Sequence, residues 1–399
     1  MGLNDTVSAE RIHIGFFGMR NAGKSSLVNA VTGQTLSVVS DVSGTTTDPV
    51  LKSMELLPLG PVVIIDTPGL DDEGPLGEMR VKKTKEIIRK TDIAVIVVDA
   101  ERGITDADNE LISAFEEKKL PYIIVYNKAD LIDNRDKHDS NSIYVSTVTN
   151  ENINELKEKI AAFGKSLQNT QYIVSDILDS GDIVVLVIPI DEAAPKGRLI
   201  LPQQQTMREI LDSHCTFIAC QDTELSQTLT NLSKKPKLII TDSQVFGKVA
   251  ENTPSDVMLT SFSILFARYK GNLKELVKGA SALSKLKDCD KVLISEGCTH
   301  HRQCNDIGTV KMPKWIEKYT NAKLQFSFTS GGEFPDDLSE YSLIVHCGGC
   351  MLNEKEMLSR ISSAVSTDIP IVNYGIAIAQ MHGILSRSLQ PFPDILSLL

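Results

Sequence analysis

The stretch GMRNAGKS (18–25) decides the fold of the first part of this 399-residue chain. It follows an alternating apolar run, RIHIGFF (11–17), and precedes SLVNAVTG (26–33), whose apolar residues recur at helical spacing. The pattern G-x-x-x-x-G-K-S between a strand and a helix is typical of a phosphate-binding loop. Its backbone amides and the helix amino terminus face phosphate oxygens. The residues that we expect to hold the nucleotide here are Gly18, Asn21, Ala22, Gly23, Lys24, Ser25 and Ser26.

Further segments complete a catalytic magnesium site. Lys24 neutralises the terminal phosphates and Ser25 ligates Mg²⁺. VVIIDTPG (62–69) is an apolar strand ending in Asp66, which reaches Mg²⁺ through water, and the amide of Gly69 contacts the γ-phosphate. SGTTTD (43–48) supplies the hydroxyl of Thr46 only when a γ-phosphate is present, so this segment is expected to order and disorder with hydrolysis.

The base of the bound nucleotide is predicted from YIIVYNKAD (122–130), a strand that ends in Asn127-Lys128-Ala129-Asp130. The carboxylate of Asp130 can accept two N–H groups from a guanine edge, which adenine does not offer in that arrangement. IYVST (143–147) is the remaining strand and places Ser146 near the base. The nucleotide is therefore expected to be GTP.

These motifs resemble those of potassium-activated GTPases that act in tRNA modification and ribosome assembly. Asn21 stands where those proteins place a ligand for K⁺, and Thr46 matches their magnesium-binding threonine, although Thr47 replaces the usual arginine. Leu70 stands where Ras-like proteins carry a water-orienting glutamine. The resemblance implies slow intrinsic hydrolysis that K⁺ stimulates.

Composition narrows the remaining function classes. The net charge of −11 and the scatter of lysines and arginines argue against a nucleic-acid partner. No long apolar run predicts a membrane span, and no basic start followed by an apolar stretch predicts a secretory signal. Seven cysteines without a secretory context suggest thiols or metal ligands. We expect a cytoplasmic protein.

The middle of the chain, from IVVLVIPID (183–191) to VMLTSFSILFARYKG (257–271), alternates strands and helices without a chemical motif. Cys215 and Cys220 flank the strand TFIA, where small buried thiols are ordinary core residues. A region of this kind is most simply a scaffold or an association surface, and we expect a homodimer.

The last third carries a second group of chemical residues. KVLISEG (291–297) and LIVH (343–346) are parallel-type strands, and they run into Cys298 and into Cys347-Gly348-Gly349-Cys350. Ligands of parallel α/β sheets gather at the carboxyl ends of strands, so these thiols are predicted to be neighbours. The spacing fits either a closed zinc site with one histidine or a three-cysteine iron–sulfur cluster. A reducing compartment disfavours a disulfide between Cys347 and Cys350.

The combination of a potassium-type GTPase region with Cys298-x-His300 and His346-Cys347-x-x-Cys350 resembles the HydF family, the GTPase and scaffold of FeFe-hydrogenase maturation. The resemblance covers the whole chain. It implies a 4Fe-4S cluster on Cys298, Cys347 and Cys350 and a transient two-iron precursor that carries CO, cyanide and a dithiolate bridge. Two radical-SAM maturases build this precursor, and apo FeFe-hydrogenase receives it.

The fourth position of the cluster stays open between several groups. Glu296 lies two residues before Cys298, so both side chains are expected to leave the strand end in the same direction. Three other residues close to the cysteines are also candidates: His300, His346 and Cys304. An exogenous ligand would leave the position exchangeable.

The sequence thus predicts an α/β protein, with a P-loop GTPase domain (1–168) followed by two further α/β domains with parallel sheets. These are a dimerisation domain (169–271) and a cluster-binding domain (272–399). The alternative interpretation is a potassium-activated GTPase of the tRNA-modification or ribosome-assembly type with a structural zinc site.

Overall fold

The structure is a computed structural model that describes residues 10–33, 50–67, 84–133, 135, 140–166, 171–190, 199–297 and 307–399. The chain forms two compact units, Met1–Thr170 and Gln171–Leu399. Among the helices within the described ranges, none is long and apolar enough to cross a membrane.

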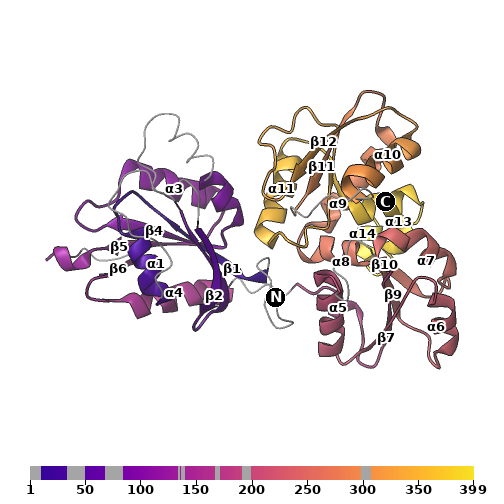
Figure 1. The fold of residues 1–399 in the computed structure, drawn as a ribbon, viewed down its shortest axis with the longest axis horizontal. Helices are drawn as coiled ribbons and strands as arrows, with labels where there is room; N and C mark the ends of the chain where they lie inside the picture. Colours follow the sequence, from indigo (N-terminus) through magenta and orange to yellow (C-terminus); the bar gives the residue numbers. More distant parts are fainter. Residues whose placement is uncertain are drawn as a thin grey trace. The chain divides into compact units, whose positions relative to one another are not determined.

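The first unit is built on a six-stranded sheet in the order β2-β3-β1-β4-β5-β6 (Figure 1). Only β2 runs antiparallel to its neighbour, and the other pairs are parallel. The strands are β1 (Ile12–Phe17), β2 (Val50–Leu56), β3 (Gly60–Asp66), β4 (Ile93–Asp99), β5 (Tyr122–Asn127) and β6 (Ser142–Tyr144). The helices are α1 (Lys24–Thr32), α3 (Asp106–Glu117) and α4 (Ile153–Ser166), and residues 84–90 are also helical.

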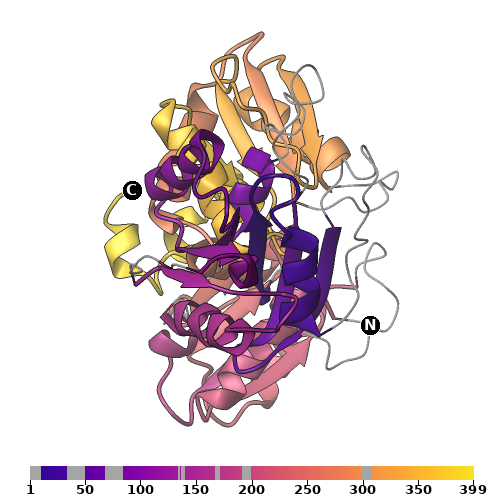
Figure 2. The same ribbon diagram turned by 90° about the vertical axis from the view of Figure 1, so that its left-hand side faces the viewer.

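Both faces of this sheet are covered, which explains its continuous apolar strands. In β4, Ile93, Val95 and Val97 pack into the core cluster that includes residues of α1 and α4. The alternate residues Ala94 and Ile96 pack into a second cluster with residues of α3. Figure 2 shows the same unit from a second direction, with its earliest strands and α1 in indigo. The loops that carry the nucleotide motifs follow the carboxyl ends of these strands.

The second unit holds two four-stranded sheets in which every described pairing is parallel, β10-β9-β7-β8 and β12-β11-β13-β14. The strands are β7 (Ile183–Val187), β8 (Thr216–Cys220), β9 (Leu238–Thr241), β10 (Met258–Ser261), β11 (Lys291–Glu296), β12 (Gln325–Ser330), β13 (Leu343–His346) and β14 (Ile371–Asn373). The helices are α5 (Leu201–Asp212), α6 (Leu225–Asn231), α7 (Phe246–Asn252), α8 (Phe262–Tyr269), α9 (Leu273–Ala280), α10 (Met312–Thr320), α11 (Glu354–Ser366), α12 (Tyr374–Met381), α13 (Leu385–Ser388) and α14 (Pro393–Leu396). The predicted fold class, a P-loop domain followed by further parallel α/β structure, is confirmed.

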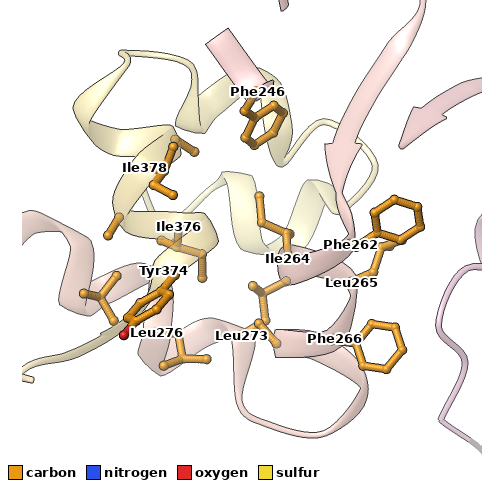
Figure 3. Packing of buried hydrophobic residues seen from close by; sticks show 14 of the residues in the cluster. Phe246, Phe262, Ile264, Leu265, Phe266, Leu273, Leu276, Tyr374, Ile376 and Ile378 are labelled. Atoms are coloured by element: carbon orange, nitrogen blue, oxygen red, sulfur yellow. The ribbon is translucent and has the colours of Figure 1, made fainter. Parts of the chain in front are cut away.

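One hydrophobic cluster runs through the whole second unit. Figure 3 shows part of it, where residues of α8, α9 and α12 gather in one interior, among them Ile264, Leu273 and Ile376. The domain boundary predicted at 271/272 falls inside this packed core and stays a prediction.

Candidate functional site

The phosphate-binding loop joins β1 to α1, as its pattern predicted. The buried ammonium group of Lys24 lies within the loop, and its Nζ donates to the carbonyl oxygens of Gly18 and Met19, both at 2.9 Å. Gly23 has φ of +87°, and a Cβ there would lie 2.2 Å from Nδ2 of Asn127. Glycine is therefore required at 23, both for its backbone conformation and for the close approach of the base-recognition strand.

The two described residues predicted to reach Mg²⁺ lie together. Oγ of Ser25, in the first turn of α1, donates to Oδ2 of Asp66 at 3.0 Å. The other carboxylate oxygen, Oδ1 of Asp66, is buried without a protein hydrogen-bond partner. An orphaned buried carboxylate oxygen next to a serine hydroxyl fits a hydrated divalent cation. Thr46 and Gly69, which were predicted to complete this site, lie outside the described residues.

The base-recognition residues are held by two separate groups of hydrogen bonds. Nδ2 of Asn127 donates to the carbonyl of Ala22 at 3.0 Å and so ties β5 to the phosphate loop. Oγ of Ser146 donates to Oδ1 of Asp130 at 2.5 Å. The same Oγ accepts the backbone amides of Val148 and Thr149 at 3.2 and 3.1 Å. Ser146 is thus held by its own turn and in turn orients the carboxylate that we expect to bind guanine.

Sequence reasoning missed Asp99 at the end of β4. Lys128 has a left-handed backbone, with φ of 64°, and its Nζ donates to Oδ2 of Asp99 at 2.6 Å. Burial tends to raise the pKa of this carboxyl, but hydrogen bonds from Lys128 and from the amides of Glu101 and Arg102 outweigh it and keep the pKa below its usual value. The ionised Asp99 therefore fixes the position of the Lys128 side chain at the carboxyl end of β4. A charged residue at the end of a buried strand was the available signal.

The second group of chemical residues lies at the carboxyl ends of β11 and β13. These strands are paired in parallel, with Ser295 opposite His346, so Glu296 and Cys347 lie next to each other at the carboxyl-terminal end of the sheet. The amides of Gly297 and Gly349 donate to Sγ of Cys347 at 3.0 and 3.3 Å. Two amides directed at one sulfur favour the thiolate form that metals bind.

The thiols themselves are half-buried and are not bonded to each other. Cys347 and Cys350 are free cysteines in the structure. Burial raises the pKa of the Cys347 thiol to about 11, although the two amides oppose this shift. Burial also raises the pKa of Cys350, while the positive charge of Lys270 lowers it. At neutral pH both groups are therefore thiols until a metal replaces the proton.

Lys270 was not expected to take part in this region. It follows α8, is 4% exposed, and its Nζ donates to the carbonyls of Cys350 and Leu352 at 3.4 and 3.3 Å. A buried ammonium group thus supports the turn after β13 from a helix far away in the sequence. Nothing in the pattern around Lys270 distinguishes it from a surface lysine at a helix end.

The described residues contain only part of the predicted metal site. Cys298, His300 and Cys304 lie outside them. Within the described ranges, no group of three His, Cys, Asp or Glu side chains has a geometry that could hold a metal ion. Glu296 is 6% exposed, and its Oε1 accepts a hydrogen bond from the hydroxyl of Tyr374 at 3.2 Å. The described donors, two thiols and a buried carboxylate, are of a kind that binds iron or zinc, but they do not by themselves form a metal site.

Comparisons with known proteins assign the second unit. A family model described as "Hydrogen maturase F dimerization domain" matches residues 173–271, and one described as "Hydrogen maturase F tetramerization domain" matches residues 274–391. The chain belongs to the HydF family. A third model, "50S ribosome-binding GTPase", matches residues 13–128. The HydF resemblance and the GTPase domain predicted from the sequence are confirmed, and the HydF second unit carries domains of self-association.

Curated relatives with GTPase names match about a third of the HydF chain. GTPase Der of Sulfurimonas denitrificans is 38% identical over 138 residues, which is 34% of this chain and 28% of the relative. The tRNA modification GTPase MnmE of Nitrosomonas europaea is 33% identical over 153 residues, 37% of this chain and 34% of the relative. The chain thus spans about a third of the length of these relatives.

Solved structures also align with part of the chain. A variant of Aquifex aeolicus Era bound to GDP.AlF4- has a TM-score of 0.36 at 21% identity, and covers 52% of this chain and 92% of its own. A probable GTP-binding protein engB has a TM-score of 0.31 at 26% identity, and covers 39% of this chain and 99% of its own.

Proposed function

We propose that this HydF-family chain is a GTP-hydrolysing scaffold that binds a 4Fe-4S cluster and delivers the two-iron precursor to apo FeFe-hydrogenase. The observation that carries this proposal is the sulfur of Cys347, which receives two backbone amides at the carboxyl ends of β11 and β13, within the span matched by the hydrogen maturase F model. Self-association through the second unit and contacts with two radical-SAM maturases belong to the same proposal.

Each described residue has a definite task at the proposed cluster site. Cys347 and Cys350, together with Cys298, provide three thiolates, and the amides of Gly297 and Gly349 stabilise the charge on the sulfur of Cys347. When bound, a cluster with three cysteine ligands supplies one iron with an exchangeable position. Glu296 and His300 are the groups that we propose for that position. The two-iron precursor is the cargo, tethered through a cyanide nitrogen.

In the first unit, Lys24 and Ser25 bind the terminal phosphates and Mg²⁺, and Asp66 holds the metal-bound water. Asp130 and Ser146 select guanine. We propose that GTP turnover governs association with partner proteins and not the iron chemistry. A nucleotide can favour one partner only through a difference in affinity between its bound states.

Anoxic reconstitution with iron and sulfide tests the cluster. The expected result is a brown protein with about four irons per chain and an electron paramagnetic resonance (EPR) signal after reduction. Tight binding of zinc without colour would instead support the alternative, a potassium-activated GTPase with a structural zinc site. Activation of apo-hydrogenase by the loaded protein then tests delivery, with cluster-free protein as the control.

Potassium stimulation has a separate test. Asn21 has a left-handed backbone, with φ of 60°, within the phosphate-binding loop. We propose that its side chain helps to bind K⁺ beside the phosphates, and that GTP hydrolysis is faster in KCl than in NaCl. Asn21→Ala should remove the difference between the two salts. Equal rates for the unsubstituted protein would sink the potassium proposal and leave the GTPase assignment untouched.

A further inference from the structure

His346 ends β13, directly before the Cys347–Cys350 turn, and both of its ring nitrogens are engaged. Its side chain is fully buried, with Nδ1 2.8 Å from the carbonyl oxygen of Cys347 and Nε2 3.1 Å from Nη1 of Arg360. An arginine side chain has only donors and stays charged. Nε2 of His346 must therefore be the acceptor. The imidazole is neutral, its proton lies on Nδ1, and it donates to the Cys347 carbonyl.

Arg360 is not free to leave this position. Its Nε and Nη2 donate to Oε1 of Glu356 at 3.0 and 2.9 Å, and Nη2 also donates to the carbonyl of Gly331 at 2.7 Å. The guanidinium lies 5.2 Å from the ring centre of Phe334 and is 1% exposed. A buried ion pair of this kind cannot separate without leaving a charge uncompensated. The lone pair on Nε2 of His346 is thus directed permanently at a cation.

The hydrogen bond to Cys347 has a consequence for the turn. A trans peptide directs its C=O and N–H in opposite directions, so a Cys347 carbonyl held by His346 turns the amide of Gly348 away from the histidine. The next amide, that of Gly349, donates to Sγ of Cys347. The histidine therefore fixes the turn in the conformation that presents amides to sulfur.

We propose that His346 is a positioning residue for the Cys347–Cys350 turn, locked by Arg360 with its proton on Nδ1, and not an iron ligand. This inference rests on the proposed cluster function and deepens it. A ligand would need a free lone pair on one ring nitrogen. Here Nδ1 carries the proton and Nε2 accepts from Arg360.

The first test needs no iron. The full chain is labelled with ¹⁵N-histidine, and long-range ¹H–¹⁵N spectra are recorded near neutral pH, with His346→Asn to assign the signal. The expected spectrum is that of a neutral imidazole protonated on Nδ1. A proton on Nε2 would mean that Arg360 does not set the tautomer, and would overturn the proposal whether or not the protein binds a cluster.

The second test uses protein reconstituted anoxically with iron and sulfide. In His346→Asn the side-chain amide can take the place of Nδ1 and keep a donor for the Cys347 carbonyl, whereas His346→Leu removes it. We expect the Asn variant to keep the iron content and the pulsed EPR spectrum of the parent protein. The Leu variant should hold iron about 10-fold more weakly, as for other lost partners of metal ligands. The exposed His382→Asn serves as the matched control.

A nitrogen coupling of imidazole size in the parent spectrum that disappears in His346→Asn would identify His346 as a ligand and overturn the inference. Equal iron loss in the Asn and Leu variants would do the same, because only a ligand role predicts that the amide donor gives no rescue. Failure of the parent chain to bind any cluster would instead count against the proposed function, and the tautomer measurement would still decide the role of His346.

Discussion

Two glycine-containing turns within the described residues, Gly18–Ser25 after β1 and Cys347–Cys350 after β13, occupy the same topological position but are supported differently. Both follow an interior strand of a mostly parallel sheet. In the first turn the cation is Lys24, a flexible side chain that rests on two carbonyls inside the loop. At the second turn Lys270 likewise donates to two carbonyls, those of Cys350 and Leu352, and a further cation behind the turn, Arg360, is fixed by Glu356. The first arrangement suits a ligand that is exchanged at every turnover, and the second suits a ligand that stays.

The largest expected effect is the loss of iron binding at the second turn, with the first turn unaffected. Cys347→Ser should abolish iron binding on anoxic reconstitution, because it removes the sulfur that receives the amides of Gly297 and Gly349. GTP hydrolysis should stay within about twofold of the parent rate, which corresponds to a change in activation free energy of under about 0.5 kcal/mol. Iron quantification and phosphate release measure the two outcomes. Cys289→Ser, at an exposed free cysteine, is the control, and normal iron content in Cys347→Ser would contradict the assignment.

Next in size is the converse change in the first turn. Lys24→Ala should lower kcat for GTP by about 100-fold, as expected for the loss of one charged group that contacts the reacting phosphate. Iron content should not change, because Lys24 belongs to the other unit. The exposed Lys52→Ala on β2 is the matched control. Loss of the cluster in Lys24→Ala would show that the two turns are not independent.

Lowering the pH should destabilise the fold through His346, which directly precedes the second turn. Burial and the charge of Arg360 lower the pKa of His346 from 6.5 to about 3. The unfolded chain therefore takes up a proton below about pH 6.5 that the folded chain refuses until about pH 3, so folding stability is complete above about pH 6.5 and falls as the pH is lowered. At about pH 5 the loss amounts to about 2 kcal/mol.

Urea unfolding of the metal-free protein near neutral pH and at about pH 5 measures this loss. His346→Asn, which cannot titrate, should lose about 2 kcal/mol less than the parent between the two conditions. An identical loss in both proteins would show that His346 is not held neutral by its surroundings.

The smallest expected effect lies in base recognition. Ser146→Ala removes the hydroxyl that orients Asp130 and should raise the Kd for GDP about fivefold, since one such hydrogen bond contributes about 1 kcal/mol. Fluorescent-nucleotide titration measures the change, and the exposed Ser113→Ala serves as the control. An unchanged Kd would mean that Asp130 keeps its orientation without Ser146.

Much of the fold could be predicted because burial and periodicity agree along most elements. The segment NLKELVKGASALSKL (272–286), which has helical spacing throughout, shows where such patterns stop being sufficient. The α-helix ends at Ala280, and residues 281–285 form a tighter 3₁₀ helix. Ser281 and Ser284 donate their hydroxyls to carbonyls three residues earlier, an interaction that suits the tighter turn. Helical spacing alone does not separate the two conformations.

For the site at the Cys347–Cys350 turn, the sequence predicted the sulfur groups but not the buried residues that hold the turn in place. Glu356 and Arg360 are spaced like a surface ion pair on a helix, yet both are almost fully buried. Arg360 lies on the same helical face as Met357, Ile361 and Ala364, so its place on an apolar stripe was the signal that could have been used. Its partners, the end of β13 and the carbonyl of Gly331, come together only through the tertiary fold.

The shared interior of the second unit makes its two halves a single cooperative body. The chain segments matched by the two association models bury their phenylalanines, leucines and isoleucines against each other (Figure 3). Cutting the chain between α8 and α9 would expose both sides of this interior at once, so neither fragment should persist alone, and calorimetry should show one heat-absorption peak for both. We therefore expect the association surfaces and the sulfur-bearing turn to unfold together, at one melting temperature.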